Sequence, residues 1–340
     1  VTVGEIMFTK IEDPSARAAD NAAANNTNTK GESAKGVKKD KQGGKPAAAA
    51  PAEEVDNHVI DFTKLDIRVG KIVKVWHHET AYCVADTDHT WVGTHGEWDN
   101  GANDGFGKMN VIATDRTGYR AMGYYDQTDI PFYYDLVSTF GTSDRYFSSL
   151  LGPTFPNRLF AYAGTSFGVV STLAGPRNGL APDGVPNIFK SLSAAGVSWK
   201  SYKSDVSASF LFPDFTGDPA QAAHFVTVDQ FATDAAAGTL PSVSFVDPAF
   251  SSQPETDEHP PSDIQLGQHF VWEQVTALLK SPEWKSSALF ITYDEHGGLY
   301  DHVAPPPACA PDDTAPDENP ELGGFDRLGF RVPLFVVSPY

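Results

Sequence analysis

The sequence predicts an α/β fold with a mostly parallel central sheet flanked by helices. Short apolar runs that suit buried strands alternate with segments of helical apolar spacing over the second half of the chain. Residues 289–291 form one such run, which ends abruptly in Asp294, Glu295 and His296. Ligands of open α/β sheets bind at the carboxyl ends of strands. This strand end is therefore the first candidate for a functional site.

The other elements are predicted from apolar spacing and from turn residues. Residues 130–140 are predicted to form a helix with a proline near its first turn, and residues 265–279 have helical apolar spacing. Residues 145–147 are predicted as a short strand, and a further helix is expected to begin near Pro156. Residues 88–106, rich in His, Asp, Trp and Gly, are expected to form binding loops. The main strand candidates are residues 197–202, 243–246, 289–292 and 332–337.

Composition limits the class of protein. At 340 residues, with 41% hydrophobic and 12% aromatic residues, the chain can build two domains or one large domain with an appendage. No run of eighteen apolar residues occurs, so no membrane-spanning segment is expected. Cys83 and Cys309 are too few for a disulfide framework or a cysteine zinc site, and whether they form one bridge stays open.

The net charge of −19 is unevenly distributed. Residues 1–82 contain twelve basic and twelve acidic residues, whereas residues 83–340 contain thirteen basic and thirty-two acidic ones. A body of that charge repels nucleic-acid phosphates. The two parts therefore have the character of different proteins.

The N-terminal part divides into three segments. Residues 1–15 are a short segment with a few apolar residues, and residues 16–57 contain almost no large apolar residue. The latter cannot bury enough surface to offset chain entropy, so a disordered linker is predicted, although its lysines could contact RNA phosphates weakly. Residues 58–80 alternate apolar and polar positions, as a half-buried strand does.

The run D-F-T-K-L-D-I-R-V-G-K-I-V-K-V within residues 58–80 resembles the start of the tRNA-binding OB-fold domain appended to methionyl-tRNA synthetases. Residues 4–13 resemble the synthetase segment that precedes this appendage. An OB-fold needs five strands, and only the first one or two are represented. We therefore expect a partial OB-like fragment, too short to close a barrel or present a binding face, which argues against tRNA binding.

The Asp294–Glu295–His296 group allows two interpretations. Adjacent carboxylates and an imidazole at a strand end can hold a divalent metal or share acid–base work. The alternative is a polar turn, which Gly297 and Gly298 would allow to be sharp.

Thr154 forms a second candidate, in the run G-P-T-F-P-N-R. A hydroxyl at a helix N-terminus lies beside unpaired N–H groups, which favour a phosphate oxygen and help an alkoxide form if a metal binds the oxygen. The alternative is that Thr154 is simply the N-cap of the helix.

Five motifs occur in order between about residues 83 and 340: D-x-D-H-T-W-x-G-T-H-x-E-W-D-N-G-x-N-D-G-F, S-S-L-L-G-P-T-F-P-N-R-L-F, D-E-H-P-P-S-D, I-T-Y-D-E-H-G-G-L-Y-D-H-V-x-P-P and G-F-R-V-P-L-F-V-V-S-P-Y. Together they resemble the phosphoesterase family of phosphatidylcholine-type phospholipases C and metal-dependent acid phosphatases. That family is a branch of the alkaline-phosphatase superfamily. The resemblance implies an alkaline-phosphatase-like fold for residues 83–340.

The resemblance also implies roles for single residues. Thr154 matches the nucleophile, which also ligates the metal, and Asp294 and Glu295 match metal-binding carboxylates. His95 and His259 match histidines that contact the phosphoryl oxygens or protonate the leaving group. His89 is an alternative to His95, and Asn157 and His296 are weaker candidates. One divalent metal ion of unknown identity is implied as cofactor.

Other polar residues are expected to be structural. Asp301 and His302 are expected to brace the glycine turn. Four histidines lie outside the motifs and are expected to be ordinary surface or core residues: His77, His78, His224 and His269.

The chain departs from the family pattern in two places. A Glu-Asn-Arg-Ser-Phe-Asp-type motif, which supplies a Glu and an Asn to the metal on the family's first strand, is not found, and synthetase-like sequence stands in its position. The family also continues beyond the position of Tyr340. We therefore expect a chimeric phosphoesterase with weakened metal affinity and impaired activity.

Three functions remain open at this point. The first is a metal-dependent phosphoric ester hydrolase of the phospholipase C or acid phosphatase type, acting through a phospho-threonine on a phospholipid or a small phosphate ester. The second is a tRNA-binding appendage protein, and the third is an inactive remnant. Bacterial family members are mostly secreted or periplasmic, but no signal peptide is recognisable, so the compartment is not predicted.

Overall fold

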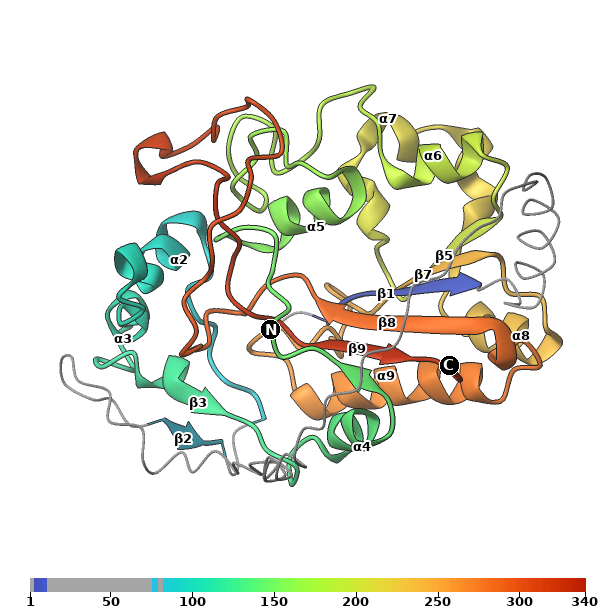
Figure 1. Ribbon diagram of the computed structural model, residues 1–340, viewed down its shortest axis with the longest axis horizontal. Helices are drawn as coiled ribbons and strands as arrows, with labels where there is room; N and C mark the ends of the chain where they lie inside the picture. Colours follow the sequence, from blue (N-terminus) through green and yellow to red (C-terminus); the bar gives the residue numbers. More distant parts are fainter. Residues whose placement is uncertain (1–2, 11–74, 79–81) are drawn as a thin grey trace, which may run out of the picture. The chain divides into compact units, whose positions relative to one another are not determined.

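A computed structural model of the chain describes residues 3–10, 75–78 and 82–340 (Figure 1). The predicted linker, residues 16–57, lies outside the described residues, as does most of the predicted OB-like fragment, residues 58–80. Within the N-terminal part, a strand is described at Val3–Lys10 and a short one at Trp76–His77.

Seven strands form the central sheet, in the order β4-β9-β8-β1-β7-β5-β6. A separate two-stranded sheet pairs β2 with β3 in parallel. The strands are β1 (Val3–Lys10), β2 (Trp76–His77), β3 (Gly123–Tyr124), β4 (Gly141–Thr142), β5 (Trp199–Lys203), β6 (Phe225–Thr227), β7 (Val243–Asp247), β8 (Ser287–Tyr293) and β9 (Leu334–Val337). The four main strands predicted from apolar runs correspond to β5, β7, β8 and β9.

The sheet is mixed, so the prediction of a mostly parallel sheet is confirmed in part: β4, β5, β6, β7 and β8 run in one direction, and β1 and β9 run in the other. β5 runs parallel to β6 and to β7, but β1 lies antiparallel between β7 and β8. β9 also pairs antiparallel with β8 and with β4. Apolar runs predict that a strand is buried, but they carry no information about its direction, and this is why the antiparallel placement of β1 and β9 was not predicted.

Helices cover both faces of the sheet (Figure 1). The α-helices are α2 (Trp91–Trp98), α3 (Phe106–Met109), α4 (Pro131–Thr139), α5 (Thr154–Ala163), α6 (Ile188–Ala194), α7 (Pro213–Thr216), α8 (Asp229–Ala237) and α9 (Ile264–Leu279). Short 3₁₀ helices are η2 (Asp99–Gly101), η3 (Tyr119–Met122), η4 (Ala208–Leu211), η5 (Pro219–His224), η6 (Trp284–Ser286) and η7 (Pro320–Leu322). The predicted helices over residues 130–140 and 265–279 are confirmed as α4 and α9.

Two apolar clusters fix these layers. One packs α4, α8 and α9 against β8 and β9, and the other packs α5, α6 and α7 against β5 and β7. Side chains alternate along a strand, so Leu289 and Ile291 of β8 enter the first cluster and Phe290 and Thr292 face the opposite side. Asp294 lies two residues after Thr292 and faces the same side of the sheet. There it lines a cavity on the face covered by α5.

Two local predictions need correction. Residues 145–147 are not a strand, because only an isolated bridge joins Phe147 to Arg331. Residues 88–106 are not simply loops, since they contain α2, which begins after Thr90: its side chain accepts a hydrogen bond from the Gly93 N–H. Polar composition masked the helix, but the capping threonine was a readable signal.

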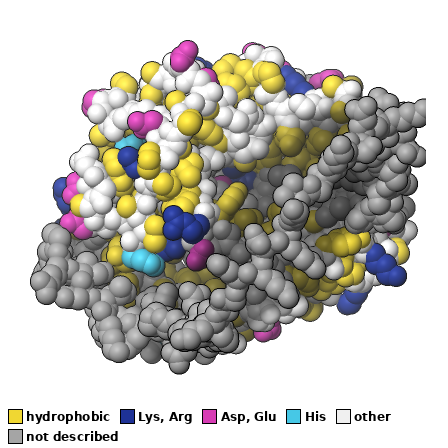
Figure 2. Space-filling view, in the orientation of Figure 1, with side chains coloured by type: hydrophobic (Ala, Val, Ile, Leu, Met, Phe, Trp, Pro, Cys, Tyr) yellow, Lys and Arg dark blue, Asp and Glu magenta, His cyan; other side chains and the backbone are white. Residues whose placement is uncertain are grey.

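The described surface is mixed in character. Acidic and basic side chains are scattered among apolar and neutral ones on the face shown in Figure 2. Cys83 and Cys309 are exposed and are not bridged to each other. No helix in the described part of the chain has the length and apolar character needed to cross a membrane.

Candidate functional site

Two strands end in buried carboxylates, and one arginine contacts both. Asp247 is the last residue of β7 and Asp294 follows β8. Arg158 of α5 places Nε 2.8 Å from Asp294 Oδ2 and Nη1 3.5 Å from Asp247 Oδ1. Burial raises the pKa of Asp247 to about 6, against the effect of the nearby Arg158 charge. The guanidinium is thus the positive charge that compensates these two strand ends.

Thr154 is the first residue of α5. The N-cap is Pro153, and the Phe155 N–H of the first turn donates to Thr172 Oγ1 at 3.2 Å, so the alternative that Thr154 is the N-cap is wrong. Its hydroxyl has no hydrogen-bonding partner among the described residues. Arg158 follows four residues later, so both side chains lie on one face of the helix. Arg158 contacts the ends of β7 and β8 from that face.

Asn157 holds the turn that precedes α5. Its Oδ1 accepts a hydrogen bond from the Leu150 N–H, and its Nδ2 donates to the carbonyl oxygens of Gly152 (2.9 Å) and Pro153 (3.1 Å). The Asn157 side-chain amide therefore fixes the position of the first turn of α5.

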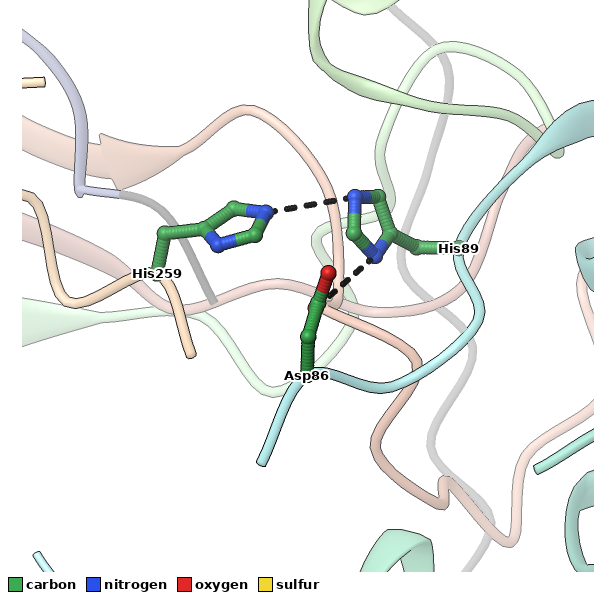
Figure 3. Close-up of side chains that lie close together, drawn as sticks. All are labelled: Asp86, His89 and His259. Carbon is green, nitrogen blue, oxygen red and sulfur yellow. Dashed lines mark hydrogen bonds and ion pairs between the residues drawn. The ribbon is translucent and has the colours of Figure 1, made fainter. Parts of the chain in front are cut away.

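Two histidines from distant segments face each other (Figure 3). Nδ1 of His89 lies 2.7 Å from the carbonyl oxygen of Thr87, and Nδ1 of His259 lies 2.6 Å from that of Pro260. A carbonyl oxygen can only accept, so both Nδ1 atoms carry hydrogen and donate. Each Nε2 of the neutral rings then presents a lone pair, and the two Nε2 atoms are 3.2 Å apart. Facing lone pairs repel unless a proton or a cation lies between them.

The carboxylate of Asp86 completes this group. Its Oδ1 lies 3.8 Å from His89 Nδ1, and one potential ligand atom of each of Asp86, His89 and His259 lies within 4.8 Å of the other two (Figure 3). Histidines that bind metals usually donate their second ring N–H to a carbonyl or carboxylate. The donor set therefore fits a divalent cation.

Glu295 and His296 belong to a buried polar chain. Nδ1 of His296 is 3.6 Å from Glu295 Oε2, and its Nε2 is 3.0 Å from Glu97 Oε2. Burial acts to lower the pKa of His296, but the two flanking carboxylates raise it to about 9. Burial likewise opposes ionisation of Glu295, yet its pKa is lowered, chiefly by the charge of His89 and the hydrogen bond with His296. Burial raises the pKa of Glu97 to about 7.

The turn after this chain requires glycine. Gly297 and Gly298 have φ of 65° and 71°, in the left-handed region. A Cβ on Gly298 would lie 2.5 Å from the carbonyl oxygen of Asp88 and 2.8 Å from Thr87 Cβ. The side chain of Thr87 donates to the carbonyl oxygen of Gly297. This close approach brings the segment carrying His89 against the segment carrying Glu295.

Glu258, the neighbour of His259, is a buried carboxyl group. The hydroxyls of Tyr133 and Tyr293 donate to it, at 2.6 Å and 2.5 Å, and burial raises its pKa to about 7. Glu258 also lines a cavity of about 460 Å³, together with His296. The cavity offers room for a substrate group beside the polar chain.

A second cavity of about 480 Å³ lies on the opposite side of β8. It is lined by Arg158 and Asp294 at one end and by apolar side chains that include Phe290 and Tyr162. The Arg158–Asp294 ion pair therefore borders a space of its own.

His95 lies apart from His89 and His259. Its Nδ1 is 2.7 Å from the carbonyl oxygen of Trp91, and its ring lines a separate cavity of about 190 Å³ with Arg327. Burial lowers the pKa of His95. Of the two histidines left as alternatives, His89 is the one that meets His259.

Asp301 forms a two-pronged ion pair. The guanidinium of Arg331 contacts its carboxylate at 2.8 Å and 2.7 Å. His302 is exposed, with Nδ1 3.7 Å from Asp301. The contacts of Asp301 tie the segment after the glycine turn to the segment leading into β9.

Several residues of the site were missed from sequence. Glu97 and Arg158 lie inside recognised motifs, and Asp247 directly follows a predicted strand. The sequence position of each residue could therefore have identified it as part of the site. Asp86 and Glu258 also lie inside recognised motifs, three residues before His89 and one residue before His259.

Comparison with known proteins gives consistent matches. The Phosphoesterase family matches residues 20–340. The match thus extends into the segments predicted to be a linker and an OB-like fragment. The synthetase resemblance of the N-terminal part and a chimeric origin find no support in these matches.

Three relatives show the level of similarity. Non-specific phospholipase C6 of Arabidopsis thaliana is 39% identical over 224 residues, covering 62% of this chain and 41% of the relative. Non-specific phospholipase C1 of the same plant is 36% identical over 258 residues, covering 71% and 47%. Phospholipase C B of Mycobacterium tuberculosis is 35% identical over 305 residues, covering 76% and 55%. The chain spans about half the length of these relatives.

Replacing Gly298 with alanine is expected to destabilise the fold by about 2–5 kcal/mol, because a left-handed backbone and a clash with the Asp88 carbonyl act together. Urea unfolding measures the change. Gly184→Ala is the matched control, since Gly184 also has positive φ (80°) but nothing lies within 4 Å of its added Cβ. The control is expected to cost ~1 kcal/mol, and equal costs for both variants would contradict the close approach.

The pKa of Glu258, about 7 in the fold against 4.5 for an ordinary glutamate, gives a pH dependence with a definite sign. The folded state binds the proton more tightly, so this contribution to stability is complete below pH 4.5 and is lost as pH rises through 7. Relative to Glu258→Gln, the wild-type free energy of unfolding should fall by about 2–3 kcal/mol over that range. Urea unfolding at several pH values measures it. The exposed Glu273→Gln variant should follow wild type, and a pH-independent difference for Glu258→Gln would refute the assignment.

Proposed function

The chain belongs to the phosphoesterase family, and on that basis we propose that it is a metal-dependent hydrolase of phosphoric esters. The observation that carries the proposal is the His89–His259 pair. Two Nε2 lone pairs, each fixed by a backbone contact of Nδ1, converge beside a carboxylate and beside the polar chain of Glu295. Such a group can hold a cation or a proton at the point where an ester oxygen departs.

The proposed nucleophile is Thr154. Its oxygen forms a bond to phosphorus, and the bond from phosphorus to the ester oxygen breaks. The proton of the Thr154 hydroxyl passes through solvent to the departing alkoxide, which leaves as an alcohol. Water then attacks the phospho-threonine, the bond to Thr154 breaks, and phosphate or a phosphomonoester is released. Support comes from the position of Thr154 as the first residue of α5 and from the motif that surrounds it.

Thr154 and the histidines are related through Arg158 and the segment that follows β8. Arg158, one helical turn after Thr154, binds Asp294. Asp294 precedes Glu295, whose pKa responds to His89. A substrate phosphate beside Arg158 would meet a positive guanidinium that is already oriented by two carboxylates.

For the divalent ion we propose Asp86, His89 and His259 as ligands. The ion would supply positive charge to the phosphoryl oxygens. Asp294 and Glu295, the carboxylates that the family resemblance implies, are less suited to this role in the present geometry, since Asp294 already pairs with the Arg158 guanidinium at 2.8 Å. The two assignments predict different metal-binding variants.

The proposed substrate is a phospholipid or a small phosphate ester. The names of the relatives, phospholipases C, support this class. The cavity of about 460 Å³ beside Glu258 offers space for the leaving alcohol.

Thr154→Ala is expected to lower kcat for p-nitrophenyl phosphate or p-nitrophenyl phosphorylcholine by about 10³-fold or more, because alanine has no oxygen to form the covalent intermediate. The assay uses the chain supplied with Zn²⁺ or Mn²⁺. Thr233→Ala, which removes a threonine hydroxyl from α8, should keep wild-type kcat. Unchanged turnover by Thr154→Ala would eliminate Thr154 as nucleophile.

Metal content distinguishes the two ligand sets. His89→Gln and His259→Gln are each expected to lose one bound divalent ion per chain, as measured by elemental mass spectrometry after dialysis. Asp294→Asn is expected to retain that ion although the fold is weakened, because Arg158 loses its partner. Loss of the ion from folded Asp294→Asn with retention in both histidine variants would transfer the site to Asp294 and Glu295.

A further inference from the structure

His259, one member of the imidazole pair (Figure 3), follows a residue with an unusual backbone conformation. Glu258 has φ of 61°, in the left-handed region that residues with a long side chain rarely adopt. Such a conformation persists where the surrounding contacts determine it. The contacts of the Glu258 side chain therefore indicate what fixes the chain immediately before His259.

Two tyrosine hydroxyls hold the carboxyl group of Glu258. Tyr133 of α4 donates to Oε1 at 2.6 Å, and Tyr293 at the end of β8 donates to Oε2 at 2.5 Å. All three side chains are buried. Each carboxyl oxygen thus has its own donor, one from a helix and one from the central sheet.

A third element, α9, approaches the same side chain through Gly267. A Cβ at this position would lie 2.1 Å from Glu258 Cγ and 2.8 Å from Oε1. Glycine inside a helix lowers helix stability relative to alanine, so its presence in α9 calls for a reason. The reason is that the Glu258 side chain occupies the space that an alanine methyl group would take.

His259 itself is held mainly by its own loop. Its N–H donates to Asp257 Oδ1 at 3.2 Å, its carbonyl oxygen accepts from the Ser262 N–H at 2.7 Å, and Nδ1 donates to the Pro260 carbonyl oxygen. These contacts lie within residues 257–262, so they orient the ring relative to the loop alone. The side chain of Glu258 ties that loop to α4, β8 and α9.

We propose that Glu258 is a positioning residue for the imidazole pair, clamped by Tyr133 and Tyr293 so that Nε2 of His259 meets Nε2 of His89. The two Nε2 atoms are 3.2 Å apart and come from segments 170 residues apart, so a small rotation of the His259 loop would separate them. The inference rests on the proposed function, because Glu258 acts through His259. Glu258 takes no part in bond making or proton transfer.

The clamp consists of the Glu258 carboxyl group and the two tyrosine hydroxyls, and its chemistry predicts a graded response to substitution. Glutamine keeps the length of the side chain and one acceptor oxygen, whereas alanine keeps neither. Glu258→Gln should therefore preserve part of the positioning that Glu258→Ala loses. Phenylalanine at position 133 or 293 removes one hydroxyl and retains the packed ring.

The test measures Tyr133→Phe and Tyr293→Phe by two readouts on the full chain. Zn²⁺ affinity is measured by calorimetry after removal of metal with a chelator, and turnover is measured with p-nitrophenyl phosphorylcholine. Each variant is expected to weaken the Kd for Zn²⁺ and to lower kcat by about tenfold to 100-fold, as loss of a contact that orients a metal ligand does. KM should stay near the wild-type value.

Tyr134→Phe is the matched control, since it removes a hydroxyl from the exposed neighbour of Tyr133 on the same helix. It should keep wild-type Kd, kcat and KM. Should both phenylalanine variants fail to fold, Gly267→Ala tests the clamp from α9, where the added methyl group displaces the Glu258 side chain. It is expected to change Kd and kcat in the same direction.

Two results would overturn the proposal. The first is a lower urea midpoint with wild-type Kd and kcat for the folded variants, because the clamp would then serve stability alone. The second is a raised KM with unchanged kcat, because Glu258 and Tyr293 line the cavity of about 460 Å³ and would then contact the substrate directly. His259→Gln, measured in parallel, distinguishes failure of the proposed function: wild-type Zn²⁺ affinity and kcat in that variant would reject the imidazole pair itself.

Discussion

The ion pairs of Arg158 are the interaction on which the arrangement of the site depends. Asp247 and Asp294 end two strands of the sheet on the face that α5 covers, and both are almost fully buried. Without a cation each would have to stay protonated or admit water. Arg158 supplies the charge, and it stands one turn after Thr154. Removing one partner of such a buried pair typically costs about 3–5 kcal/mol. The register of α5 against the sheet, and hence the position of Thr154, is set by this contact.

Backbone carbonyls play a comparable part in the imidazole pair. Thr87 and Pro260 accept from the Nδ1 atoms of His89 and His259, and this fixes which nitrogen of each ring is available for chemistry. Backbone carbonyl groups therefore determine which nitrogen of each ring carries the hydrogen. The two rings therefore keep the same tautomer whatever binds between them, which is the preorganisation that a cation or proton site requires.

The sequence predicted which strands are buried and several residues of the candidate site. It gave much less information about which strands and which side chains pair with each other. Apolar runs located β5, β7, β8 and β9, since a buried strand has to be apolar. They could not show that β1 would enter antiparallel, because strand direction depends on the path of the whole chain. The motifs brought Thr154, His259 and Glu295 into consideration. They did not reveal that Arg158 would pair with Asp294, or that His95 would lie in a separate cavity, because the facing of a helix is decided by tertiary packing.

The central position of β1 has a consequence for how the chain folds. Val3–Lys10 pairs with residues 243–246 on one side and with residues 287–293 on the other, across separations of more than two hundred residues. The middle of the sheet therefore cannot be completed until β8 has left the ribosome. Contacts of that range make folding slow, because the loop entropy is lost before the ladder forms. Until β8 is synthesised, the edge of β1 that β8 will occupy is unpaired, and other extended chains could pair with it. Completion of the sheet thus joins strands that are synthesised far apart in time.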